Sequence, residues 1–251
     1  MKKVTHLDVA MLAGEILVQS GSETHRVEDT MTRILTHAHS ESTNAFAFTT
    51  GIFATQTEVG KEAQTLIRRI HTRTLNLNAI AQVNDISRKL CTDVLDSSQA
   101  LEALKAIPNQ TYPRWLHDVS LILLISGFSI LLGGKFPELI VTSLNAGLLV
   151  LFFKVTDKID ANPFIRSALG ATLITLGASL IQLITLKAQT DIVIISSMMP
   201  LVPGVIITTA IRDTLYGDYM AGTSRAVEAL VIAASVAIGV GMGLRLLGGL
   251  L

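Results

Sequence analysis

The second half of the sequence contains five long apolar runs without a charged residue, and this feature restricts the fold more than any other. The third and fourth runs reach the about 20 residues that a helix needs to cross a hydrocarbon core of about 30 Å. A water-soluble helical core is the alternative, but neither of these two runs leaves a polar face wide enough for water. The pattern therefore predicts an α-helical polytopic membrane protein with about five transmembrane helices. The runs are Val119–Gly134, Leu139–Phe153, Ser167–Leu186, Ile192–Ile211 and Ala229–Leu244.

Charged residues are concentrated in the first part of the 251-residue chain. Positions 1–117 carry 24 of the 40 acidic and basic residues, a density that is typical of a soluble domain. We therefore expect a cytoplasmic α+β domain over residues 1–112 and a transmembrane helical domain over residues 113–251. The expected spans lie near residues 116–134, 137–153, 166–186, 192–211 and 226–246.

Lysine and arginine residues in the short connections between the runs indicate the orientation. With the N-terminus inside, six of them lie on the cytoplasmic side and three lie outside. The first charges of the chain are not followed by an apolar run, so the start is not a secretory signal. We therefore expect a multi-pass protein of the cytoplasmic (inner) membrane with a cytoplasmic N-terminus and an outer C-terminus. The inner set is Arg114, Lys154, Lys158, Arg166, Arg212 and Arg225, and the outer set is Lys135, Lys187 and Arg245.

The first part of the chain alternates helical and strand-like patterns. Leu7–Gln19 has helical periodicity, and Ser20–Glu23 has the spacing of a capping box at the start of a second helix. Two strand-like runs follow, Asn44–Thr55 and Gln64–Thr74, with a turn near Val59–Lys61. Two further helices complete this part, one with its apolar stripe on Ala79, Val83, Ile86 and Leu90, and one over Ser97–Ile107. In the second strand-like run, alternation places three basic side chains on one face: Arg69, His71 and Arg73. We interpret this face as exposed to solvent, with anion binding as the alternative.

The fourth apolar run is interrupted by Pro200, Pro203 and Gly204. Two prolines three residues apart cannot lie in a continuous helix without the loss of backbone hydrogen bonds. Broken helices at membrane depth tend to line a cavity, because neighbours, water or a ligand must satisfy the freed groups. A half-helix that begins near Gly204 would aim N–H groups and a positive dipole end inward, which suits a substrate carboxylate. A proline kink that serves packing alone is an equally good interpretation.

Five charged residues follow this break, at the inner mouth of the fourth and fifth spans. They are Arg212, Asp213, Asp218, Arg225 and Glu228. An ionisable side chain at or near the membrane is a candidate for a substrate clamp or a proton carrier, because protonation removes its charge from a low-dielectric region. The alternative is a set of headgroup-region charges that only follow the orientation rule. Uncharged polar residues inside the spans more often bridge helices than bind substrate. These residues are Asn145, Gln182 and Ser196–Ser197.

No residue pattern indicates a metal, a cofactor or a catalytic centre. His25, His37 and His39 could meet at a metal, but no cysteine and no zinc-type spacing accompanies them. Cys91 is the only cysteine and fits a small buried hydrophobic residue. The chain has no phosphate-binding glycine loop, so direct ATP-driven transport is not expected, and its zero net charge provides no basic field for nucleic acid.

Two segments resemble the signatures of the threonine/serine exporter family, and the resemblance covers nearly the whole chain. The first is Ala13–Thr30, which contains Gly14, Glu15, Gly21, Glu23, Arg26, Glu28 and Asp29. The second comprises Pro200–Gly204, Ala210–Asp213, Gly217–Asp218 and Gly222–Glu228.

The resemblance implies an inner-membrane exporter of small polar metabolites that is driven by the proton motive force. Some members export threonine and serine, and others export dicarboxylates such as succinate. Members with one long chain have about twice as many spans as this sequence. In the split type, a chain like this one works with a smaller membrane protein of the same family that supplies the remaining spans. A membrane-anchored ligand sensor or a hydrolase-like domain is the alternative, but no Ser/His/Asp or Cys/His spacing supports catalysis.

Overall fold

A computed structural model describes residues 4–38, 40–60, 62–108, 112–159, 161–185 and 188–248 of the chain. The side chains of residues 181–185 and 247–248 lie outside this description. The chain divides into two compact units. Unit 1 comprises Met1–Thr111 together with Ile207–Ala226, and unit 2 comprises Tyr112–Ile206 together with Val227–Leu251. A segment from the apolar half of the sequence is therefore part of the same unit as the charged N-terminal region.

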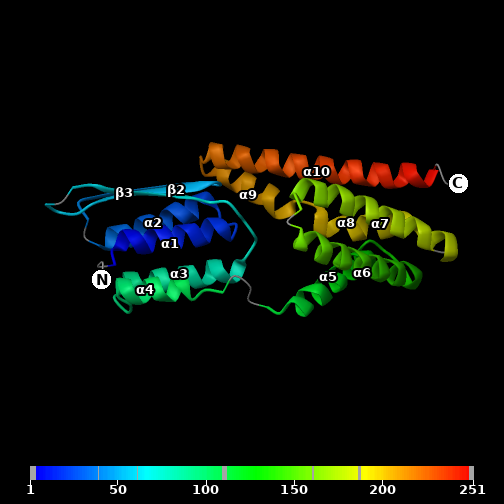
Figure 1. Cartoon of the computed structure of the whole chain (residues 1–251), viewed down its shortest axis with the longest axis horizontal. Helices are drawn as coiled ribbons and strands as arrows, with labels where there is room; N and C mark the ends of the chain where they lie inside the picture. Colours follow the sequence, from blue (N-terminus) through cyan, green and yellow to red (C-terminus); the bar gives the residue numbers. More distant parts are fainter. Residues whose placement is uncertain are drawn as a thin grey trace. The chain divides into compact units, whose positions relative to one another are not determined.

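Unit 1 is layered around its first two helices, α1 (His6–Gln19) and α2 (Thr24–His37). An antiparallel sheet with the strand order β1-β2-β3 covers one side of them, and two further helices, α3 and α4, pack against the other side of α1 (Figure 1). The bounds of these elements are β1 Ser42–Phe48, β2 Gly51–Thr57, β3 Gln64–Arg69, α3 Leu77–Cys91 and α4 Ser97–Lys105.

Local sequence explains where several of these helices begin. Thr5 and Asp8 form a capping box at the start of α1, and Asp96 and Gln99 form another at the start of α4. The Asn76 side chain accepts a hydrogen bond from the Ala79 amide at the start of α3. Because α1 lies between the sheet and α3–α4, its apolar residues are buried nearly all round rather than along one stripe.

The sheet differs from the sequence prediction in the number of its strands. The run predicted as one strand over Asn44–Thr55 is two antiparallel strands, because the chain reverses at Thr49–Thr50. Cross-strand pairing places Phe46, Phe53 and Ile67 in one exposed row, whereas Ala47, Ile52 and Ala54 face the helices. The third strand ends at Arg69, so the prediction that His71 and Arg73 share its face is wrong.

The start of α2 also differs from the prediction. Glu23 is the residue that precedes the helix, and its side chain makes no capping hydrogen bond, so the predicted capping box at Ser20–Glu23 is wrong. Gly21 makes the turn that precedes it, with φ of 78°, a conformation that glycine adopts without steric cost. The remaining helical predictions of this region, for α1, α3 and α4, are confirmed.

The second half of the chain is helical and apolar, as predicted. Four of its helices, α5 (Arg114–Leu131), α6 (Phe136–Lys158), α7 (Pro163–Thr185) and α10 (Tyr219–Gly248), are long and apolar enough to cross a membrane. A fifth span is obtained if the bent pair α8 (Thr190–Met198) and α9 (Gly204–Leu215) counts as one. The last helix begins seven residues before the predicted span 226–246, and α9 and α10 each contribute residues to both units.

Small residues allow the helices of unit 2 to pack closely. A Cβ atom at Gly239 of α10 would lie 2.2 Å from the Ala168 carbonyl oxygen of α7, and one at Gly243 would lie 2.7 Å from the Thr175 side chain. The Thr172 hydroxyl donates to the Gly239 carbonyl at 3.0 Å. A glycine pair four residues apart that brings two backbones together is typical of helix contacts in membranes. Large apolar side chains such as Leu123, Leu131 and Leu144 point outward, where a membrane protein contacts lipid.

Candidate functional site

The helix break predicted at the fourth apolar run is confirmed. The α8 helix ends at Met198, a short 3-10 turn, η1 (Met199–Leu201), follows, and Val202 is extended before α9 begins at Gly204. The two helices are bent by 53°. Pro200 and Pro203 explain the interruption, because neither can donate a backbone hydrogen bond. A Cβ atom at Gly204 would meet nothing within 4 Å, so no neighbouring atom requires glycine there.

A buried amide links three helices directly before this break. The Asn145 side chain of α6 donates to the Ile174 carbonyl of α7 and to the Ser197 hydroxyl of α8, both at 3.0 Å. The prediction that polar residues inside the spans bridge helices is therefore confirmed for Asn145 and Ser197. Ser196 instead donates to the Ile192 carbonyl of its own helix, and the Gln182 side chain lies outside the described residues.

Sequence reasoning missed a buried carboxylate in unit 2. Glu138, which is 3% exposed, accepts hydrogen bonds from the backbone amides of Lys135 and Gln189 at 2.8 and 2.9 Å. It therefore joins the start of α6 to the segment that precedes α8. The sequence signal for Glu138 is its position as an acidic residue in the first turn of a helix that begins with Phe-Pro. No local pattern predicts its contact with Gln189, which is 51 residues away.

Four of the five charged residues predicted at the mouth of the spans, all except Glu228, lie in unit 1, against the start of α2. We call this contact the polar junction. The residues on the α2 side are Ser22, Glu23, Thr24, His25 and Glu28. The residues on the opposite side are Arg212, Asp213, Tyr216, Asp218 and Arg225. The second set belongs to the segment Ile207–Ala226, here termed the α9–α10 hairpin. Gly217, with φ of 92°, lies in its turn.

Asp213 is the centre of the polar junction and is fully buried. Its carboxylate accepts hydrogen bonds from the Thr24 amide at 2.9 Å and from the Thr24 hydroxyl at 3.3 Å. The Arg225 guanidinium forms an ion pair with the same carboxylate at 3.0 Å and donates to the Ser22 carbonyl at 2.8 Å. Asp213 thus caps the first turn of α2, a role that side chains of the local sequence usually fill.

Other contacts of the polar junction surround this buried pair. Arg212 forms an ion pair with Glu23, and the rings of His25 and Tyr216 stack with centroids 3.9 Å apart. The Thr49 hydroxyl, in the turn between β1 and β2, lies 3.3 Å from the hydroxyl of Ser224. The junction therefore joins α2 to the α9–α10 hairpin through charged and aromatic groups, and the hydroxyl contact beside it joins the turn of the sheet to the same hairpin.

Burial raises the pKa of two carboxyl groups in the junction. For Asp218, burial is the largest cause, the neighbouring Asp213 charge raises the pKa further, and His25 opposes the shift. For Glu28, burial again raises the pKa, and the hydrogen bond that its carboxylate accepts from the Ala47 amide at 2.8 Å opposes it. The charges of Asp218 and Asp213 raise the pKa of Glu28 as well.

The structure brings six of the predicted site residues together and places the others elsewhere. Glu23 and Glu28 of the first signature meet Arg212, Asp213, Asp218 and Arg225 of the second. Gly14 lies under Met31, where a Cβ atom would be 2.4 Å from the sulfur, and Glu15 pairs with Arg68 of β3. Arg26 is exposed, and Glu228 is half-buried on α10 within unit 2.

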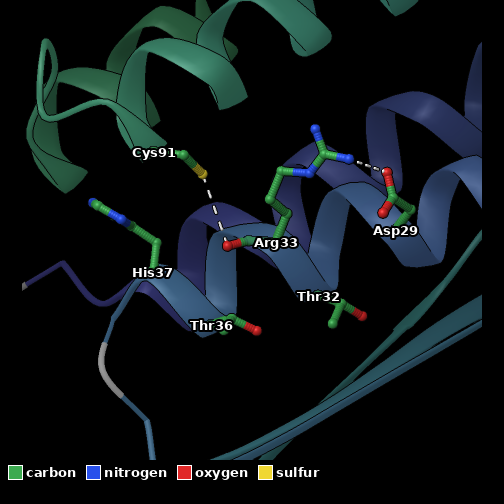
Figure 2. A pocket seen from close by; sticks show the side chains of 6 residues that line it. All are labelled: Asp29, Thr32, Arg33, Thr36, His37 and Cys91. Carbon is green, nitrogen blue, oxygen red and sulfur yellow. Dashed lines mark hydrogen bonds and ion pairs between the residues drawn. The ribbon is translucent and has the colours of Figure 1, made fainter.

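A second polar feature of unit 1 is an open hollow of about 410 Å³ on α2 and the end of α3 (Figure 2). Figure 2 shows Arg33 turned toward Asp29, at 2.6 Å, and the Cys91 thiol directed at the Arg33 carbonyl at 3.8 Å. Burial raises the pKa of Cys91, which favours an unreactive thiol. The charges of the hollow therefore neutralise one another rather than converge on a ligand. Its lining is Asp29, Thr32, Arg33, Thr36, His37 and Cys91.

The described histidines do not assemble a metal site. His25 stacks on Tyr216, whereas His37 lies beside Asp93 at 3.1 Å, and the predicted third member, His39, lies outside the described residues. Within the part of the chain that the structure describes, no group of three or more His, Cys, Asp or Glu residues is placed to hold a metal ion.

The two signatures that meet in the polar junction can be compared with known proteins. A family model described as "Putative threonine/serine exporter" matches residues 8–247. The chain belongs to this family. A Mycobacterium tuberculosis protein named "Probable threonine/serine exporter" is 22% identical over 242 residues, which are 95% of this chain and 46% of the relative. The chain thus spans about half the length of that relative.

Two other relatives match over most of their own length. Proteins of Escherichia coli and Klebsiella aerogenes, each named "Probable succinate transporter subunit YjjP", are both 24% identical to the chain. The alignments cover 94% of this chain and 92% of the first protein, and 92% of this chain and 90% of the second. No solved structure matches the chain.

Proposed function

We propose that this protein is a subunit of a secondary-active exporter of small polar metabolites in the cytoplasmic membrane. The observation that carries the proposal is the family match over residues 8–247 in a chain whose described residues contain four to five candidate membrane spans. The substrate is threonine and serine, or a dicarboxylate such as succinate, and the proton motive force drives export. The names of the relatives support both substrate classes, because one is named a probable threonine/serine exporter and two are named probable succinate transporter subunits.

The proposed substrate seat is the break between α8 and α9, at Pro200, Pro203 and Gly204. Two helix ends meet there within one candidate span, and the positive dipole end of α9 starts at Gly204. Half-helix ends of this kind bind anionic groups of substrates in transporters with discontinuous helices. A carboxylate is common to threonine, serine and succinate, so one seat of this kind suits all three.

The proposed coupling residues are the titratable groups that follow the break. Asp213, Asp218 and Glu228 are the candidate proton carriers, and Arg212 and Arg225 hold the carboxylates of Glu23 and Asp213. In this proposal the two arginines fix the α9–α10 hairpin to α2 rather than clamp the substrate. The N-terminus and unit 1 are placed in the cytoplasm and the C-terminus outside, following the distribution of lysine and arginine.

A smaller membrane protein of the same family is the proposed partner. The chain covers 46% of the Mycobacterium tuberculosis exporter but 92% of the Escherichia coli protein, whose name describes a subunit. A second chain would supply the spans that the longer relative carries in one polypeptide.

Efflux from proteoliposomes tests the proposal. Vesicles that contain the chain and its partner are loaded with labelled threonine, serine or succinate, and efflux is followed with and without a pH gradient. Gly204→Leu should slow efflux, because a large side chain enters the proposed seat. Gly241→Leu is the matched control in α10, since a Cβ atom there also meets nothing within 4 Å. Normal efflux by Gly204→Leu would contradict the proposed substrate seat. If wild-type vesicles export none of the three solutes, the proposed function is wrong.

A further inference from the structure

The polar junction contains more acidic groups than its guanidinium groups can neutralise. Glu23 is paired with Arg212, and Asp213 is paired with Arg225. Among the described residues, His25 is the basic side chain whose charge acts on both Glu28 and Asp218. With a neutral imidazole, the junction therefore carries two uncompensated negative charges when both carboxyl groups are ionised.

The geometry around these two carboxyl groups is confined. Glu28 accepts the hydrogen bond from the Ala47 amide of β1, and the Asp218 amide donates to the Asp213 carbonyl at 2.9 Å. The Asp218 Oδ2 and His25 Nδ1 atoms are buried and have no hydrogen-bond partner among the described residues. The titratable and charged groups of the junction are Glu23, His25 and Glu28 on α2 and its start, Arg212, Asp213, Tyr216 and Asp218 on α9 and the turn, and Arg225 on α10.

We propose that Glu28 and Asp218 bind a proton from solvent, and that this proton holds the α9–α10 hairpin against the start of α2. The step converts one carboxylate and one solvent proton into a neutral carboxylic acid. The two carboxyl groups of Glu28 and Asp218 then carry one negative charge instead of two. The neutral acid can also donate a hydrogen bond, which an ionised carboxylate cannot. This inference concerns the junction itself and does not depend on which solute the protein exports.

The direction of the pH dependence follows from linkage. Burial and the neighbouring carboxylates raise the pKa of both groups when the hairpin is docked, so docking takes up a proton. The stabilisation is fully present below the ordinary pKa of an exposed carboxyl group and is lost as the pH rises through the raised value. Because Asp213 caps the Thr24 amide only while the hairpin is docked, that amide reports docking directly.

Hydrogen–deuterium exchange of the full-length chain in lipid nanodiscs tests this inference between pH 4.5 and 8. After correction for the intrinsic rate, protection of the Thr24 amide should decrease with rising pH, by up to about tenfold per pH unit where one proton is released. The first turn of α4 is the internal control, because Asp96 caps the Gln99 amide at 2.8 Å and its pKa is lowered by hydrogen bonds from Ser98 and Gln99. Its protection should not decrease over this range.

Two isosteric variants identify the proton-binding groups. Glu28→Gln can still accept from the Ala47 amide, and Asp218→Asn keeps the shape of the turn, so each removes a titration rather than a contact. In the double variant, protection of Thr24 should stay high and independent of pH up to pH 8. Asp29→Asn, on the exposed face of α2, should keep the wild-type dependence.

A flat pH profile of the wild-type chain would overturn the proposal, and so would an unchanged profile in the double variant. If Glu28→Gln prevents folding, Asp218→Asn alone decides, because it must reduce the slope. The exchange experiments can contradict proton binding at the junction while efflux from vesicles persists. The proposed proton binding and the proposed exporter function are therefore tested separately.

Discussion

Units 1 and 2 satisfy their buried polar groups in different ways. Unit 1 buries a full ion pair, Asp213 with Arg225, and surrounds it with further charges. Unit 2 holds its buried carboxylate, Glu138, with backbone amides and not with a guanidinium. Several of its buried hydroxyls donate to carbonyls of their own helices, and Asn145 connects three helices as a neutral amide. Neutral groups of this kind are less costly than charges in a bilayer, where water cannot compensate them. Four of the five charged residues that follow the helix break therefore interact with other polar groups of unit 1, whereas Glu228 lies in unit 2. The hydroxyls are those of Thr175, Ser179 and Ser196.

The largest expected effect breaks the buried ion pair of unit 1. Asp213→Ala leaves the Arg225 guanidinium buried without its carboxylate and removes the cap of α2. The loss of one partner of a buried pair destabilises a protein by about 3–5 kcal/mol. Asp213→Asn should be less harmful, because its amide oxygen can still accept from the Thr24 amide. The free energy of unfolding in detergent, from denaturant titration followed by circular dichroism, measures both. A loss below about 1 kcal/mol in Asp213→Ala would mean that the junction contributes little to unit 1.

An overpacked helix contact in unit 2 should have the next largest effect. Gly239→Leu places a side chain where a Cβ atom would lie 2.2 Å from the Ala168 carbonyl oxygen, so α10 must move away from α7. Overpacking of this kind costs about 1–3 kcal/mol. Gly241→Leu should change stability little, since its Cβ atom meets nothing within 4 Å. Thermal unfolding in detergent compares the two variants, and equal midpoints would contradict the close contact between α7 and α10.

Sequence patterns predicted the elements of both units better than the contacts between distant residues. Hydrophobic runs predicted the membrane helices, and the missing amides of Pro200 and Pro203 predicted the break, because both signals are local. The capping prediction at Ser20–Glu23 failed because the acceptor for the Thr24 amide is Asp213, 189 residues away. The run Asn44–Thr55 was predicted as one strand, since Thr49–Thr50 contains no glycine or proline to mark the reversal.

The neutral bridge of unit 2 should contribute less than the buried ion pair of unit 1. Asn145→Leu removes two hydrogen bonds, to Ile174 and to Ser197, without leaving a charge unpaired. Hydrogen bonds between helices in membranes contribute about 0.6–1.7 kcal/mol each. Ser197→Ala removes one of the two and should lose about half as much. Thermal midpoints measured in one lipid composition give this ratio, and a larger loss in Ser197→Ala than in Asn145→Leu would show that the amide is not the centre of the bridge.

The smallest expected effect concerns an ion pair of the same charge type on the surface of unit 1. Arg33 and Asp29 are 2.6 Å apart on α2, closer than Arg225 and Asp213, but their side chains are 54% and 62% exposed. Water and salt screen an exposed pair at this spacing, which contributes about 0.3–0.5 kcal/mol. Arg33→Ala should therefore lower the unfolding free energy by about a tenth of the loss in Asp213→Ala, or by slightly more where the Arg33 alkyl chain covers α2. Raising the salt concentration from about 0.05 to about 1 M should largely remove the effect of Arg33→Ala, because the Debye length falls to about 3 Å and exposed charges are then screened. The effect of Asp213→Ala should persist, because a buried pair is screened much less. Equal losses in the two variants would show that distance, and not burial, sets the strength of ion pairs in this unit.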